Sequence, residues 1–215
     1  LVFFSKTPTY DPEELVAYEL GYKTQWMDNS LQLNGSFYFY DYENIHTVAT
    51  EVNSFFGTST SVLPAPGAEI KGIEAGLTWL ATDRLTLGGN FSYTPNEYSE
   101  DLEILDPAGF DRPASLFGAA TSLKNINGNQ LLAVPESKFN GWMSHVTPLD
   151  SGANLTFSGS YSWIDKVYYS PFENEDEMAD DYGRLDLRAS WTSADGRMIV
   201  SGFVNNVLDD IGILQ

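Results

Sequence analysis

Six carboxylates stand within the nine residues 173–181. Clustered carboxylates are the ligands that hard divalent cations take, so a cation site is one interpretation of this run. Its spacing matches no EF-hand loop, and a solvated acidic loop is the simpler prediction. His46 and His145 are far apart, no Cys is present, and neither a Ser-His-Asp order nor a GxSxG elbow occurs. We therefore assign no catalytic residue, no metal ligand and no cofactor.

A second chemical group consists of four tyrosines and one lysine. Tyrosine offers flat apolar area and a hydroxyl at little entropic cost, which suits it to holding a small-molecule ligand. The candidates are Tyr40, Tyr42, Tyr98, Lys166 and Tyr168. They are far apart in the sequence, so the elements that carry them decide whether they form a site.

The stretch 155–163, LTFSGSYSW, shows the pattern that organises the chain. Every second residue is apolar or aromatic, apart from one Gly, and the residues between them are only Thr and Ser. Strict alternation predicts a strand with different environments on its two sides. The order aliphatic, aliphatic, Gly, aromatic, aromatic recurs over 31–39 and 85–93. Two large aromatics at the end of an apolar face favour a strand that crosses a bilayer, because aromatic rings settle at the membrane interface.

The same reading applied to the whole chain predicts eight strands, joined alternately by short turns and long loops. Each short turn contains an Asp, and the long segments are rich in Gly, Pro and polar residues. Short turns on one side and long loops on the other are typical of bacterial outer-membrane barrels. The expected strands are 14–27, 31–45, 69–81, 85–93, 137–147, 155–169, 182–192 and 197–207, the turns lie at Asp28, Asp83, Asp150 and Asp195, and the loops are 46–68, 95–136 and 168–182.

The composition excludes several classes of protein. The 215 residues carry a formal net charge of -19, which argues against a nucleic-acid partner because phosphate binding needs a basic surface. No run of 18 apolar residues exists, so no transmembrane helix is expected. No signal peptide opens the sequence, and we expect a fragment or an internal piece of a longer protein.

Four motifs, in order, carry a family resemblance. They are YELGYKT at 18–24, FYFYDYENI at 37–45, IKGIEAGLTW at 70–79 and VNNVLDD at 204–210, preceded by Pro12-Glu13. With them the chain resembles the C-terminal barrel of TonB-dependent outer-membrane receptors. The resemblance implies an all-β fold: an antiparallel up-and-down transmembrane β-barrel of about 22 strands, of which residues 1–215 form a sector of about eight. The plug domain, the energy-coupling box and the closing strand are expected to be absent from this piece.

The resemblance also implies a function. It indicates a receptor, not an enzyme, in the outer membrane of a Gram-negative bacterium that imports a scarce nutrient such as a ferric siderophore or similar metal chelate. The implied partners are outer-membrane lipid and lipopolysaccharide, a small-molecule ligand, and the TonB complex through the missing N-terminal part. Two alternatives remain open, an outer-membrane barrel enzyme and a soluble β-sandwich binding module.

Counting by two along the strands places the tyrosine and lysine candidates on the polar, lumen-facing side. At about 3.3 Å per residue and a tilt near 40°, they lie roughly 25–35 Å above the short turns, at the extracellular mouth. We therefore predict that Tyr40, Tyr42, Tyr98, Lys166 and Tyr168 form a ligand vestibule. The alternatives are an external aromatic girdle, bracing of loops, or a β-bulge that turns them outward.

Charged residues also alternate along 182–192. Arg184, Asp186 and Arg188 share the polar face of that strand. A structural ladder of charges on the lumen wall is the simpler interpretation, and contact with the plug domain is the alternative.

Overall fold

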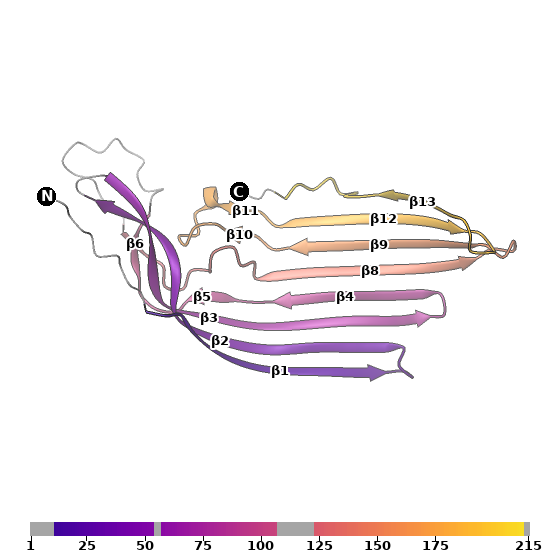
Figure 1. Ribbon diagram of the computed structural model, residues 1–215, viewed down its shortest axis with the longest axis horizontal. Coiled ribbons are helices and arrows are strands. Elements are labelled where there is room, and N and C mark those ends of the chain that lie inside the picture. The colour runs from indigo at the N-terminus through magenta and orange to yellow at the C-terminus, as the bar shows by residue number, and fades with distance from the viewer. Residues whose placement is uncertain (1–10, 54–56, 107–122, 213–215) are drawn as a thin grey trace.

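The described strands build one antiparallel meander. The computed structural model describes residues 11–53, 57–106 and 123–212. Each main strand pairs with the next along the chain, so the sheet runs β1-β2-β3-β4-β8-β9-β12-β13 and ends at two open edges, β1 and β13 (Figure 1). The predicted all-β, open sector of a barrel is therefore confirmed. The main strands are β1 Glu14–Trp26, β2 Leu31–Asn53, β3 Gly57–Thr82, β4 Leu85–Tyr93, β8 Ser137–Pro148, β9 Asn154–Ile164, β12 Tyr182–Thr192 and β13 Ile199–Val204.

The two ends of the sheet differ, as predicted. The four short turns all lie at one end, and the long connections lie at the other (Figure 1). The first turn contains Met27, Asp28 and Asn29 at φ of 52°, 52° and 68°, a left-handed conformation that Asn and Asp tolerate best among non-Gly residues. In the last turn Gly196 has φ 69°, and the Asp195 carboxylate accepts bonds from the Ser193 hydroxyl and the Arg197 N–H. The residue types of the short turns, which can be read from the sequence, therefore determine the structure of this end of the sheet.

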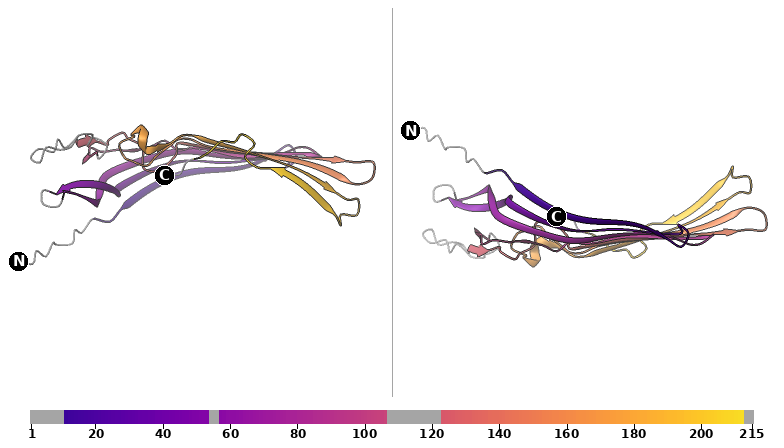
Figure 2. Two further views of the ribbon diagram at one scale, coloured as in Figure 1. Left: turned by 90° about the horizontal axis from the view of Figure 1, so that it is seen from above. Right: turned by 90° about the horizontal axis from the view of Figure 1, so that it is seen from below.

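The two faces of the sheet have opposite character. In register, Leu20 lies beside Phe37 and Phe37 beside Ile73, whereas the adjacent row on the other face holds Ser36 and Glu74. Leu20 is 72% exposed and Phe37 49% exposed, so nothing in the described part of the chain covers the apolar face. The sheet is one curved layer (Figure 2). This arrangement contradicts the β-sandwich alternative, in which a second sheet covers the apolar face.

The prediction of a loop over 46–68 is wrong. β2 and β3 continue as a long hairpin, paired from Ile45 with Ala65 to Asn53 with Gly57. The segment is rich in Thr and Val, whose β-branched side chains favour extended backbone. The Gly and Pro that suggested a loop mark a local break instead, because the pairing skips Asn44, at φ 55°, and Pro66, which has no N–H to donate.

Three other boundaries also differ from the prediction. The strand expected over 155–169 ends at Ile164, and β10 Val167–Tyr168 pairs separately with β11 Met178–Ala179. The strand expected over 197–207 is shorter, since β13 spans Ile199–Val204 and Asn206, just after it, adopts a φ of 51°. The segment expected to be irregular contains three short strands, and the acidic loop contains one 3₁₀ turn. They are β5 Asn96–Tyr98, β6 Glu103–Leu105, β7 Leu123–Asn125 and η2 Glu175–Glu177.

A small hydrophobic core lies at the loop end. We call it the loop core. Buried side chains from β3, β5, β6 and the segment after β7 form it, and Tyr42, Ile70 and Phe172 pack against it. Because Ala65 and Ala68 both belong to it although they are three residues apart, the strand changes face at the break near Pro66. The loop core consists of Ala65, Ala68, Tyr98, Ile104, Ile126 and Leu131.

No helix among the described residues is long and apolar enough to cross a membrane.

Candidate functional site

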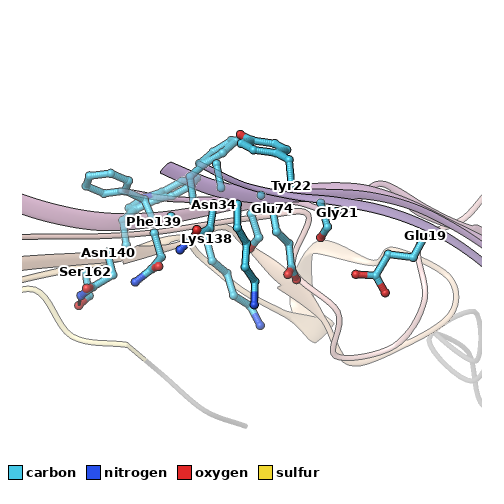
Figure 3. A pocket seen from close by; sticks show the side chains of 18 of the residues that line it. Glu19, Gly21, Tyr22, Asn34, Glu74, Lys138, Phe139, Asn140 and Ser162 are labelled. Atoms are coloured by element: carbon cyan, nitrogen blue, oxygen red, sulfur yellow. Dashed lines mark hydrogen bonds between the residues drawn. The ribbon is translucent and has the colours of Figure 1, made fainter. Parts of the chain in front are cut away.

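A row of polar side chains crosses the inner face of the sheet at one level. Strand register places these residues side by side on seven neighbouring strands, and most of them line a shallow hollow of about 940 Å³ (Figure 3). Figure 3 shows Glu74 and Lys138 projecting to the same side as Asn140 and Ser162, with Tyr22 and Phe139 on the opposite side. The row consists of the side chains of Lys23, Asn34, Asn90, Asn140, Ser162 and Arg184, with Gly76 at the position between Asn34 and Asn90.

Carboxamides dominate this row and hold defined positions. Asn140 Nδ2 donates to Ser162 Oγ at 2.8 Å. Asn90 Oδ1 lies 3.0 Å from the point that a Cβ would occupy at Gly76, so any side chain there displaces the amide. The enclosed Asn34 Oδ1 accepts no hydrogen bond from the described residues. Carboxamides donate and accept at once, so this face can bond to polar groups of either kind inside a lumen.

The charged residues of β12 connect it to its neighbours. Arg184 Nε lies 3.0 Å from Asp186 Oδ1, and the same carboxylate accepts the Asn206 N–H at 2.8 Å. Arg188 Nη2 donates to Ser201 Oγ on β13 at 3.1 Å. These contacts support the structural ladder that the alternation predicts.

A second inner hollow holds two aromatics that the sequence analysis did not single out. Its volume is about 460 Å³, and Trp142, Phe203, Asp186 and Arg188 line it with several serines. The indole of Trp142 lies over Gly88, with its nearest ring atoms 2.3 Å from where a Cβ would be. Alternation is poor over 137–147, so the sequence does not indicate on which face Trp142 lies. A Gly directly opposite a large ring is the signal that could have revealed it.

Three of the predicted vestibule residues lie near the hairpin of β2 and β3. Tyr40 stacks on Tyr38 with ring centres 5.0 Å apart, and Tyr42 donates to Glu13 Oε2 at 3.5 Å. Tyr98 is only 3% exposed, in the loop core, and its hydroxyl lies 3.2 Å from Thr47 Oγ1. Burial raises the pKa of Tyr98, so its hydroxyl stays protonated. Tyr42 and Tyr98 flank Ala68 in one row, as counting by two predicts.

The other two predicted residues form a separate pair. Lys166 Nζ donates to the Tyr168 hydroxyl at 2.9 Å and lies 5.1 Å from the centre of its ring. This hydrogen bond, and then the electrostatic attraction between the ammonium and the same Tyr168 oxygen, raise the pKa of Lys166. The pair lines a hollow of about 470 Å³ with Glu69 and Lys71.

This pair and the tyrosines of β2 lie on different sides of the sheet. Lys71 sits over Phe39, on the apolar face, whereas Tyr40 projects to the other side. The count that placed Lys166 and Tyr168 in the lumen assumes a continuous strand, and the strand ends at Ile164. Whether any of the five residues touches a ligand stays a prediction.

The acidic run 173–181 directs its carboxylates to separate partners. Glu173 accepts the Gln130 N–H at 2.7 Å, and Asp181 accepts the Trp163 indole N–H at 3.0 Å. Within the ranges that the structure describes, no three His, Asp or Glu side chains are arranged to hold a metal ion.

The open meander, the uncovered apolar face and the polar inner face together define a sector of a transmembrane β-barrel wall. Tyr18 and Trp26 bound the apolar face of β1. They are eight positions apart, roughly 26 Å along the strand, which is about 20 Å across the bilayer at a tilt near 40° and fits within the apolar band of outer-membrane barrels.

The particular family follows from comparison with known proteins. The family model "TonB dependent receptor-like, beta-barrel" matches residues 2–207, and the chain belongs to this family. The resemblance seen in the motifs is therefore confirmed. The chain is 26% identical over 159 residues to the probable TonB-dependent siderophore receptor PiuA of Acinetobacter baumannii, covering 74% of this chain and 18% of that protein.

Solved structures share the fold. The crystal structure of the siderophore receptor PiuA from Acinetobacter baumannii matches with a TM-score of 0.67 and 21% identity, covering 93% of this chain and 25% of that one. The ferric yersiniabactin uptake receptor FyuA from Yersinia pestis matches with a TM-score of 0.65 and 16% identity, covering 92% of this chain and 25% of that one. The copper transporter OprC matches with a TM-score of 0.60 and 13% identity, covering 94% of this chain and 26% of that one. The chain therefore spans about a quarter of the length of these structures.

Proposed function

We propose that this chain forms part of the wall of an outer-membrane receptor that actively imports a ferric siderophore or similar metal chelate. The observation that carries the proposal is the family match over residues 2–207. The relatives support the ligand class, since one is named as a probable siderophore receptor, one as a ferric yersiniabactin uptake receptor and one as a copper transporter. Energy from the TonB complex, in a Gram-negative bacterium, belongs to the same proposal for the whole receptor.

The two faces of the wall support different partners. The apolar face, bounded by Tyr18 and Trp26, suits contact with outer-membrane lipid and, at the loop end, with lipopolysaccharide. The polar face, with its row of carboxamides, suits a water-containing lumen. Both assignments depend on the closure of the barrel by strands outside this sequence.

The ligand vestibule is a proposal of its own. Tyr40 and Tyr42 offer partly buried rings on the inner side, of which Tyr40 stacks on Tyr38, and Tyr98 supports them from the loop core. Lys166 and Tyr168 offer a cation and a hydroxyl in their own hollow. The five residues thus contribute in two groups. The tyrosines of β2 contact the ligand from the inner side, and the pair of Lys166 and Tyr168, on the other side of the sheet, guides it from the rim.

Transport is tested in cells that carry the full-length receptor. We expect uptake of a ⁵⁵Fe-loaded siderophore to need both the receptor and TonB, whereas binding at 4 °C needs the receptor alone. Binding and uptake that are both independent of the receptor, across a panel of ferric chelates and a copper chelate, would contradict the proposal. A chemically altered ligand released without uptake would instead favour the barrel enzyme.

The vestibule is tested by equilibrium binding. Replacing Tyr40 and Tyr42 together by Ala should weaken binding about tenfold, because each removes a large contact surface. Tyr18→Ala, on the outer face, is the matched control and should leave the affinity unchanged. Unchanged affinity after all five vestibule residues are replaced, in a receptor that is folded and exposed on the cell, leaves only a structural role.

A further inference from the structure

A buried charge lies where two loops meet. Asp106, at the end of β6, is 1% exposed. A carboxylate taken out of water needs a cation and hydrogen-bond donors, or its burial is very unfavourable. Asp106 has both, since Lys124 Nζ lies 2.5 Å from its Oδ2 and Asn174 Nδ2 donates to its Oδ1 at 3.3 Å.

Lys124 joins the same two segments a second time. Its Nζ donates to Asn174 Oδ1 at 3.4 Å and lies 5.9 Å from the centre of the Phe172 ring. Phe172 in turn packs against the loop core. Asp106 and Lys124 come from the connection between β5 and β8, whereas Phe172 and Asn174 come from the connection between β9 and β12.

The hairpin of β2 and β3 belongs to the same assembly. Leu105, next to Asp106, pairs with Thr50 on β2, and Ile104 pairs with Lys124 on β7. Further along, Asn129 Nδ2 donates to the Pro171 carbonyl at 2.8 Å. Three connections that are far apart in the sequence therefore meet around one buried carboxylate.

We propose that Asp106, Lys124 and Asn174 form an interloop latch that makes the described parts of these three connections move as one body. The charge of Asp106 makes the latch cooperative, because opening either loop leaves the carboxylate short of a partner while it is still buried. The rim of the wall above β2–β12 is then a preformed surface that a ligand meets as a unit. The proposal does not depend on which solute the receptor transports.

Hydrogen exchange of the full-length receptor in detergent tests the latch. Lys124→Met keeps the aliphatic stem and removes the cation. It should speed amide exchange about tenfold to hundredfold in both 123–131 and 167–174, with β4 and β9 unchanged. Adding Asp106→Asn to this variant removes the buried charge and should restore most of the protection. Arg197→Met, which removes an equal charge at the opposite end of the sheet, is the matched control.

The distribution of the effect decides the outcome. Faster exchange in both loops, reversed by the second substitution, supports the latch. Faster exchange confined to 123–131 would reduce the contact to a local ion pair, and unchanged exchange in both loops would also overturn the proposal. If Lys124→Met does not fold, Asn174→Ala removes the hydrogen bonds that Asn174 makes with Asp106 and Lys124 and leaves the ion pair of these two residues in place, and a weaker response in the same two loops is expected.

Discussion

The wall and the loop end of this chain are stabilised in different ways. In the wall, each residue belongs to one of two faces, and its environment follows from its position along the strand. At the loop end, Ala65 and Tyr98 share one core through contacts between distant segments, and a break at Asn44 changes the faces. A single substitution should therefore act according to its face in the wall, and according to its long-range partners at the loop end.

The largest expected effect follows from placing a charge on the apolar face. Phe91 lies in the same cross-strand row as Tyr22. Tyr22 in turn lies halfway between Tyr18 and Trp26 along β1. Phe91→Arg should lower the free energy of unfolding of the intact receptor by about 1–4 kcal/mol, because the cation is forced into the lipid-facing apolar band, where the cost grows from the interface to the mid-plane. Folding titrations of the receptor in lipid vesicles measure this change in the free energy of unfolding.

The neighbouring residue supplies the control for that comparison. Asn90 is exposed and projects to the polar face. Asn90→Arg should cost less than about 1 kcal/mol, within the range of ordinary exposed substitutions. Equal effects at the two positions would mean that the two faces do not differ in environment.

A smaller effect is expected from crowding the inner face. Gly88→Val places a Cβ against the Trp142 ring, which must move, and overpacking of this kind costs about 1–3 kcal/mol. Thermal unfolding followed by tryptophan fluorescence detects both the loss and the altered indole. Gly202 has open space at its Cβ position, so Gly202→Ala serves as the control. A variant at Gly88 with unchanged stability and emission would show that Trp142 does not lie there.

The smallest effect concerns one hydrogen bond of the loop end. Tyr98→Phe removes the contact with Thr47 and should cost about 1 kcal/mol, because the buried Thr47 hydroxyl loses its partner. Hydrogen exchange should report the loss near the loop core and leave β8 and β9 unchanged. Tyr42→Phe, whose hydroxyl has only a long and exposed contact, should be close to neutral. A loss spread evenly over the wall would mean that the two regions are not independent.

The wall could be predicted from the sequence because residues close together in the sequence determine its strands and turns. Alternation and Asp-containing turns located β4 at Leu85–Tyr93 and β12 at Tyr182–Thr192 without error. The polar row follows from the same count for β2 and β4, since parity puts Asn34 and Asn90 on one face. Only poor alternation over 137–147 concealed Trp142.

The loop end could not be predicted in the same way. Gly and Pro in 46–68 suggested a loop, although the β-branched residues around them extend the hairpin. Counting by two beyond Ile164 assumed a strand that ends there, so the placement of Lys166 and Tyr168 was extrapolated. The partners of Asp106 lie 18 and 68 residues away, and no short-range pattern indicates such a meeting.

The most direct test of the whole account is a cysteine scan along β9, Asn154–Ile164, in the full-length receptor in lipid vesicles. Each single Cys carries a fluorophore, and brominated lipid and aqueous iodide serve as quenchers. We predict a period of two, with lipid quenching at Phe157, Tyr161 and Trp163, and aqueous quenching at Thr156, Ser158 and Ser160 unless a lumenal group covers them. Lipid quenching at the serine positions, or no alternation along the strand, would contradict the two-faced transmembrane wall.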